Sequence, residues 1–346
     1  MITGSEIKIC SQKLLPHHQN ELNDIHSSGK SQEHIEKLQA AFFIKKIWPK
    51  GSRIKIGFLG DPPDRKIQKN IIPDSKDLDP LQKEFQEDFQ KNDFSIINAI
   101  KKIVNERIKP LVNLDISFTD NMSDANVRVS FDPNGGAWSL VGTDHLDQKD
   151  PNTATMNLGW FDVPTTIHEF GHVLGMIHEH QNPKGQKIMW DKNKVFEWAK
   201  ENQGWSEDTT KENIINKYDK KLINGSSFDP LSIMLYFFPA SLTTNNKGTQ
   251  QNFRLSGEDV LWIHNTYPRD TGISPEKFYK DTYKINLKDS ISKSKKLSSS
   301  FSSEKNHDVN DDNDKKLFNW KNILIFILIL FIILLIITFI WKVSRR

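Results

Sequence analysis

Several short runs of alternating apolar and polar residues occur between residues 48 and 160. Alternation places every second side chain on one face, so each run predicts a half-buried strand. A loop that contains Pro80 is expected before a helix. This helix should start near Asp93, its N-cap, and stop at Pro110. Strands are expected at residues 48–59, 114–118, 127–131, 135–142 and 154–160. We therefore expect a mixed α/β subdomain.

The glycine-bounded run at residues 135–142 has two interpretations. It is either an exposed sheet edge that binds a peptide as an added strand, or a core strand followed by a loop. Farther along, residues 191–200 are expected to be helical. A last helix, capped at Ser256, is expected to precede Pro268, which closes the domain.

A helix that begins near Pro164 carries the residues with the clearest chemistry. Residues four apart lie on one side of a helix, so the imidazoles of His168 and His172 can meet at one point. Gly175 has no Cβ and can end the helix in a left-handed conformation. His178 lies past this bend and can reach the same point from another direction. Three imidazoles with an open fourth position suit a catalytic zinc ion.

Glu169 follows the first histidine and points beside the metal, where a general base for an activated water stands. The spacing His-Glu-x-x-His-x-x-Gly-x-x-His is the signature of metzincin metalloproteases. An amphipathic helix with solvated histidines would explain neither the glycine nor the third histidine. His180 is interpreted as a side chain behind the ligands or on the surface, since zinc needs an open position for water.

A tight turn downstream supplies two further candidates. Met234 is either an ordinary core residue or the apolar floor beneath the metal, in the methionine turn that accompanies this signature. Tyr236 would reach the same site, where its phenol could coordinate zinc weakly or donate a hydrogen bond to a developing oxyanion. Glu169 and Tyr236 are therefore the catalytic candidates.

Together these residues resemble the astacin-like metzincins, in particular the disulfide-free peptidases of bacteria and fungi. The resemblance is carried by residues 136–144, 155–160, 178–183 and 228–234. It implies an α+β metzincin fold, with a twisted mixed β-sheet, an active-site helix, a smaller C-terminal subdomain and a horizontal substrate cleft. It also implies zinc held by His168, His172 and His178, with Glu169 as base and Tyr236 as an extra ligand.

The resemblance further suggests that Glu179 corresponds to the acid that anchors the processed N-terminus in astacins proper. Leu235 replaces a histidine that is usual in the family's turn, which should affect packing more than chemistry. Cys10 is the single cysteine, so no internal disulfide can form, and a reducing compartment fits this. Cys10 is interpreted as an ordinary exposed thiol, with latency through a zinc-bound thiolate as the alternative.

The apolar run at residues 323–341 contains 19 residues without a charge. As a helix it would extend about 28 Å, enough to span a bilayer core. Trp320 and Trp341 flank it like interface anchors. The polar start of the chain predicts no signal peptide, so we expect a single-pass tail anchor. The cytosolic side is favoured for the catalytic domain, although basic residues on both flanks leave the orientation nearly undecided.

The 47 Lys+Arg residues nearly balance the 44 Asp+Glu residues, so no nucleic-acid partner is implied.

The domain organisation follows from changes in composition along the chain. We expect an N-terminal extension (1–40), a catalytic domain (41–270), a flexible polar linker (271–321), a transmembrane helix (322–342) and a short basic tail (343–346).

The function that these features predict is a membrane-anchored zinc endopeptidase acting on proteins or peptides. One alternative is a non-catalytic, zinc-stabilised binding module displayed on a membrane. Another is a membrane-remodelling protein that acts through its tail alone. The intact Glu169 argues against a pure binding module, which has no use for a base.

Overall fold

The computed structural model describes residues 11–13, 46–62, 77–90, 94–182, 188–217, 228–270 and 272–302. The chain divides into two units, Met1–Phe301 and Ser302–Arg346, and the first contains nearly all of these residues. Cys10 and the predicted span at 322–342 lie outside the described residues. Within the described ranges, no helix is both long enough and apolar enough to cross a membrane.

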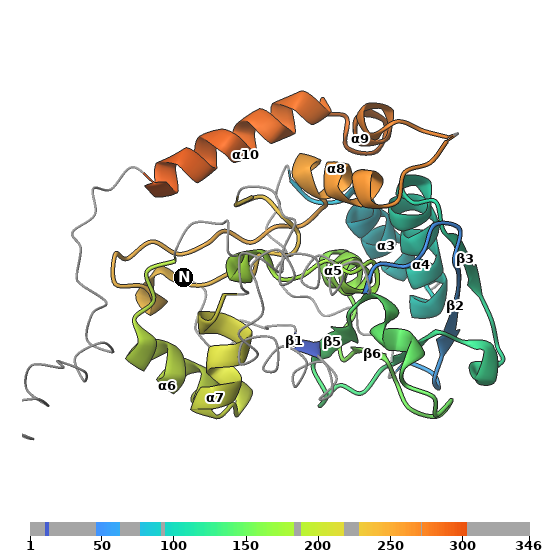
Figure 1. Cartoon of the computed structure of the whole chain (residues 1–346), viewed down its shortest axis with the longest axis horizontal. Helices are drawn as coiled ribbons and strands as arrows, with labels where there is room; N and C mark the ends of the chain where they lie inside the picture. Colours follow the sequence, from blue (N-terminus) through green and yellow to red (C-terminus); the bar gives the residue numbers. More distant parts are fainter. Residues whose placement is uncertain are drawn as a thin grey trace, which may run out of the picture. The chain divides into compact units, whose positions relative to one another are not determined.

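The described strands form one mixed sheet with the order β1-β5-β6-β4-β2-β3 (Figure 1). All neighbouring strands are parallel except β5 and β6, which are antiparallel. This confirms the mixed sheet expected from the alternating pattern. The strands are β1 (Ser11–Lys13), β2 (Arg53–Phe58), β3 (Asp115–Phe118), β4 (Val127–Ser130), β5 (Ala137–Leu140) and β6 (Met156–Leu158).

Helices enclose two apolar clusters in the described part of the chain. The larger cluster joins β2, β3, β4 and β6 to α3, α4, α5, α8, α9 and α10, and the smaller one joins α6 and the π-helical turn η7 to Tyr236 and Phe238. The smaller cluster also includes Ala137 of β5, so it joins this part of the chain to the sheet. The helices are α3 (Pro80–Gln90), α4 (Ile96–Ile103), its π-helical continuation η2 (Val104–Ile108), α5 (Val163–Val173), α6 (Lys192–Gln203), α7 (Glu207–Thr210), η7 (Lys211–Ile215), α8 (Gly257–Thr266), α9 (Pro275–Tyr283) and α10 (Leu287–Ser302).

Two helix starts differ from the expectation. Pro80 is the first residue of α3, where a loop was expected, and the Asp79 carboxylate accepts the Leu81 N–H at 2.9 Å. A proline suits the first turn of a helix because the N–H it lacks would have no helical partner there. The N-cap of α4 is Ser95 rather than Asp93, because the Ser95 hydroxyl accepts the N–H of the third helical residue.

The predicted flexible linker at 271–321 is helical in the part that the structure describes, which corrects that prediction. Helices α9 and α10 place Phe278, Tyr279, Tyr283 and Leu287 in the main core, each 5% exposed or less. The few apolar residues of this stretch occur at positions that face the core, so a low apolar content did not prevent folding. The domain therefore continues beyond Pro268.

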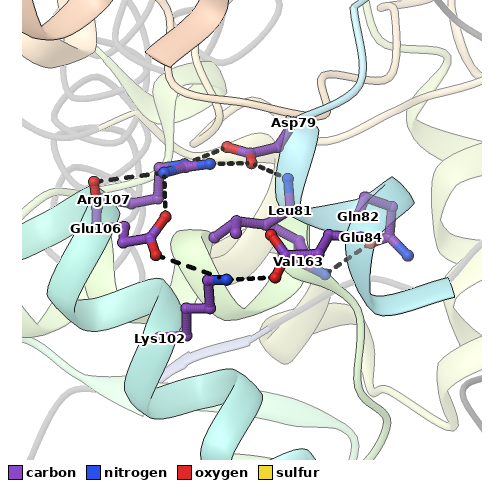
Figure 2. A network of polar contacts seen from close by, with 8 residues as sticks. All are labelled: Asp79, Leu81, Gln82, Glu84, Lys102, Glu106, Arg107 and Val163. Atoms are coloured by element: carbon purple, nitrogen blue, oxygen red, sulfur yellow. Dashed lines mark hydrogen bonds and ion pairs between the residues drawn. The ribbon is translucent and has the colours of Figure 1, made fainter. Parts of the chain in front are cut away.

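A buried polar network fixes where the active-site helix begins (Figure 2). The Arg107 guanidinium donates two hydrogen bonds of 2.8 Å to the Asp79 carboxylate, a bidentate geometry that orients both groups. Asp79 also caps α3, which carries Gln82. The Gln82 side-chain oxygen accepts the N–H of Val163, the first residue of α5, at 2.9 Å. Helix α3 thus positions the start of α5.

Candidate metal centre and active site

The end of α5 turns the chain back toward the site, as the sequence predicted. Gly175 has a φ of +88°, in the left-handed region. Its N–H donates to the His172 carbonyl at 2.8 Å, and the Met176 N–H donates to the Gly171 carbonyl at 2.9 Å. These two bonds define a Schellman ending, which satisfies carbonyls that the helix leaves without partners. The bend brings His178 beside the helix it has just left.

Three buried histidines converge on one point. The ligand atoms of His168, His172 and His178 all lie within 4.8 Å of one another. The Nε2 atoms of His172 and His178 are 3.0 Å apart. Tetrahedral zinc with Zn–N bonds of 2.0–2.1 Å requires about 3.3 Å between ligand nitrogens, so this spacing is close to that of a metal site.

The hydrogen bonds of the histidines leave their Nε2 atoms available for a metal. Nδ1 of His168 donates to the Ile233 carbonyl at 2.9 Å, and Nδ1 of His172 donates to the Met176 carbonyl at 2.8 Å. Nε2 of His168 is buried and has no hydrogen-bond partner among the described residues. Such orphaned atoms are rare in folded proteins, and a metal ion would satisfy this one. The residues present therefore fit zinc.

Burial also keeps these imidazoles neutral, which is the state that binds a metal. It lowers the pKa of His168 to about 4 and holds the pKa values of His172 and His178 well below their usual range. Deprotonated ligands require no proton release when a cation binds. The site is therefore prepared for a cation near neutral pH.

Met234 forms an apolar floor against α5. It is 1% exposed, and a Cβ added to Gly171 would lie only 2.6 Å from the Met234 sulfur. Gly171 stands between the two helical histidines, so the sulfur packs directly against the ligand-bearing stretch. Met234 also belongs to the main apolar cluster, so its position agrees with both interpretations.

The structure brings both catalytic candidates to the same place. Glu169 is fully buried on α5, adjacent to His168. The Tyr236 hydroxyl lies 2.5 Å from Nε2 of His178. The Tyr236 ring also stacks on His168, with centroids 5.6 Å apart and planes 21° apart. The three histidines and Tyr236 therefore form one buried cluster, and Glu169 is buried on the helix that carries two of these histidines.

Comparison with known proteins agrees with this geometry. The model of the astacin peptidase family matches residues 84–252. A structure of myroilysin is 30% identical, with a TM-score of 0.51, and the alignment covers 66% of this chain and 98% of that chain. The chain belongs to the astacin family. It is accordingly a zinc-dependent metalloendopeptidase, with a histidine triad positioned to bind the metal.

Two other solved structures are also similar to this astacin-family chain. A crystal structure of myroilysin is 26% identical, with a TM-score of 0.45, and covers 78% of this chain and 94% of that chain. High choriolytic enzyme 1, a hatching enzyme zinc-protease from Oryzias latipes (medaka fish), is 14% identical, with a TM-score of 0.36. It covers 64% of this chain and 93% of that chain. A search of curated proteins gave no match.

His180 lies behind the ligands of this astacin-family site. It is 2% exposed, and its Nε2 hydrogen-bonds to the Asn213 carbonyl at 3.0 Å. Its ring lies 5.4 Å from that of His178 and 5.0 Å from that of Tyr236. His180 thus supports two site residues and anchors them to η7, in agreement with the interpretation that it is not a ligand.

The carboxyl groups of Glu179, Asp229 and Asp259 lie near the methionine turn, and the sequence did not predict that they come together. Glu179 accepts hydrogen bonds from the Asn182 amide at 3.0 Å and from the Asp229 N–H at 2.9 Å, and burial raises its pKa to about 8. Asp259, in the first turn of α8, forms a capping box with Ser256 and also accepts the Ile233 N–H at 2.8 Å. No local pattern signals the contacts with Asp229 and Ile233, because they join residues far apart in the chain.

The run at residues 135–142 contains β5, which has a pairing partner on each side. Strand β6 pairs with one side, and β1 pairs in parallel with the other, with Ser11 opposite Trp138. In the described sheet β5 is therefore an inner strand and not the exposed edge of the first interpretation. In this structure the N-terminal segment occupies that position.

Proposed function

We propose that this astacin-family peptidase is a membrane-anchored endopeptidase that uses Glu169 as its general base and Tyr236 as its oxyanion donor. The observation that carries the proposal is the convergence of three buried imidazoles, with Nε2 of His168 left without a hydrogen-bond partner among the described residues and the fully buried Glu169 next to His168 in the chain. A site built only to bind would not need the carboxylate.

The catalytic roles follow from position and chemistry. Zinc, when bound by His168, His172 and His178, supplies a Lewis acid that polarises the scissile carbonyl and lowers the pKa of water to about 7. Glu169 takes a proton from the attacking water and passes it to the leaving amine. Tyr236 donates a hydrogen bond to the oxyanion, because its hydroxyl already reaches the ligand His178.

The substrate is proposed to be an extended peptide that pairs with the outer side of β5. Backbone groups along a sheet edge bind a strand of any sequence, and side-chain pockets then select among sequences. The pairing of β1 with β5 supports this, because it demonstrates that this edge accepts a strand. A substrate that uses the same edge must displace β1.

The membrane anchor is proposed to be the apolar run at residues 323–341, with the catalytic domain on the cytosolic side. The support is the sequence of this run, 19 uncharged residues flanked by Trp320 and Trp341. A charge at the centre of a membrane helix costs about 2.5–3.5 kcal/mol. Charged substitutions near Ile332 should therefore prevent insertion.

Alkaline carbonate extraction of membranes from cells that express the full chain tests this proposal. We expect casein-cleaving activity to stay in the pellet for the original protein and for the control Ile332→Leu. The double variant with Ile329→Lys and Ile332→Lys should move into the supernatant and remain active. In sealed vesicles, external trypsin should digest the catalytic domain. Activity that is extracted from the original protein would contradict the anchor, and protection from trypsin would contradict the cytosolic side.

A further inference from the structure

Helix α10 reaches the carboxylates behind the methionine turn. Ser294 on α10 is 3% exposed, and its hydroxyl donates a hydrogen bond of 2.5 Å to Oδ1 of Asp229. This serine lies in the stretch expected to be a linker, and beyond the residues 84–252 that match the family model. The contact is therefore a feature of this chain that the family match does not include.

Asp229 is connected to the methionine turn through Ser256 and Asp259. Oδ2 of Asp229 accepts the Ser256 hydroxyl at 2.5 Å, and the Ser256 oxygen accepts the Asp259 N–H at 2.9 Å. The Asp259 carboxylate accepts the Ser232 hydroxyl at 2.7 Å and the Ile233 N–H at 2.8 Å. Two buried carboxylates thus fix the backbone at Ile233.

The Ile233 carbonyl completes the connection to the metal site. It accepts the Nδ1 hydrogen of His168 at 2.9 Å, which sets the tautomer and the ring orientation of that histidine. A continuous series of hydrogen bonds therefore leads from Ser294 on α10 to the imidazole of His168. A shift of the turn would change the direction of the His168 lone pair.

The first turns of α10 pack closely against the start of α8. The Gly257 N–H, at the start of α8, donates to the Ser290 hydroxyl of α10 at 3.0 Å. A Cβ added to Gly257 would lie 3.0 Å from Ile291 and 3.1 Å from the Ser290 Cβ, so the two helices meet with little free space. Figure 1 shows α10 and α8 side by side.

We propose that α10 is part of the catalytic scaffold and that Ser294 is a positioning residue, which fixes the carbonyl that orients His168. This rests on the proposed role of His168 as a zinc ligand. Loss of the Ser294 hydroxyl leaves Oδ1 of Asp229 with the Leu231 N–H as its remaining described donor. The turn can then relax, and the ligand geometry relaxes with it.

The expected loss of zinc affinity in Ser294→Ala depends on how many groups separate Ser294 from the metal ligand. Substitution of groups that hydrogen-bond directly to metal ligands lowers metal affinity by about 10–100-fold. Ser294 acts through several intervening groups, so Ser294→Ala should weaken zinc binding by about 3–10-fold. His168 acts at the reacting centre and does not bind the distant parts of a substrate. We therefore expect kcat to fall while KM stays nearly unchanged.

The test compares variants of the full chain by chelator competition for zinc, by kcat and KM on one peptide, and by melting temperature. Ser292→Ala is the matched control, because Ser292 is exposed on the same helix. We expect zinc affinity and kcat to fall in Ser294→Ala, to be retained in Ser294→Thr and to be unchanged in Ser292→Ala. Wild-type zinc affinity and kcat in Ser294→Ala, whatever its melting temperature, would overturn the proposal, as would an equal loss in Ser294→Thr.

A second variant keeps the test decisive if Ser294→Ala does not fold. Ser294→Cys retains the size and a weaker donor, so an intermediate loss of zinc affinity is expected, and wild-type affinity would overturn the proposal. His168→Ala distinguishes a failure of the proposed zinc site from a failure of the proposed role of Ser294. If that variant keeps wild-type zinc affinity, the proposed function fails. If it loses zinc while Ser294→Ala does not, only the positioning role fails.

Discussion

Replacement of Glu169 by alanine is expected to lower kcat/KM for peptide cleavage by about 10²–10⁴-fold, the range that a general base contributes. Zinc content should stay at the wild-type level, because the residues positioned to hold the metal are His168, His172 and His178. The loss follows from chemistry rather than folding. Without the carboxylate, no group on α5 takes the proton from the attacking water.

The measurement determines zinc content and casein cleavage on the same preparation. Glu169→Gln is the matched variant, because it keeps the size of a fully buried side chain but cannot act as a base. Both variants should retain zinc and lose activity to a similar extent. Retained zinc with unchanged cleavage would show that Glu169 is not the base.

Replacement of Tyr236 by phenylalanine is expected to lower kcat by about 10²-fold, toward the lower end of the range for one oxyanion donor. The ring would keep its contacts with His168, His178 and His180, so the fold should be preserved. KM should change little, because the hydroxyl binds a charge that develops only in the transition state.

Steady-state kinetics on one fluorogenic peptide measure this loss. The control is Phe238→Leu, which alters packing beside the Tyr236 ring but removes no hydroxyl. A lower kcat in Tyr236→Phe with a nearly unchanged kcat in the control would support the role of the phenol. A rise in KM alone would mean that Tyr236 binds the substrate instead of stabilising the oxyanion.

The active-site helix could be predicted because its information is local. His168, His172 and Gly175 lie within about two helical turns, so periodicity and one glycine define both the face and the end of the helix. Strands β2 to β6 were predicted from similar local patterns, whereas β1 lies in the stretch interpreted as an N-terminal extension. Tyr236 is farther away in sequence, and its identification depended on the turn that accompanies the zinc motif.

The scaffold around the site could not be predicted in the same way. Pro80 was interpreted as a loop residue, although it begins the helix that places Val163. From the sequence alone, the serines of α10 resemble those of a polar linker. Only the structure shows that Ser294 lies against Asp229, 65 residues away in the chain. A hydrogen bond between residues so distant leaves no periodic pattern in the sequence.

The central claim is that cleavage requires one zinc ion held by the three histidines. The most direct measurement is a titration of zinc into the metal-free full chain, with bound zinc and casein cleavage recorded at each addition. The account predicts no cleavage without metal, and a linear rise that saturates at about one zinc per chain, as for a single three-histidine site. Cleavage by the metal-free protein, or full zinc occupancy without cleavage, would contradict it.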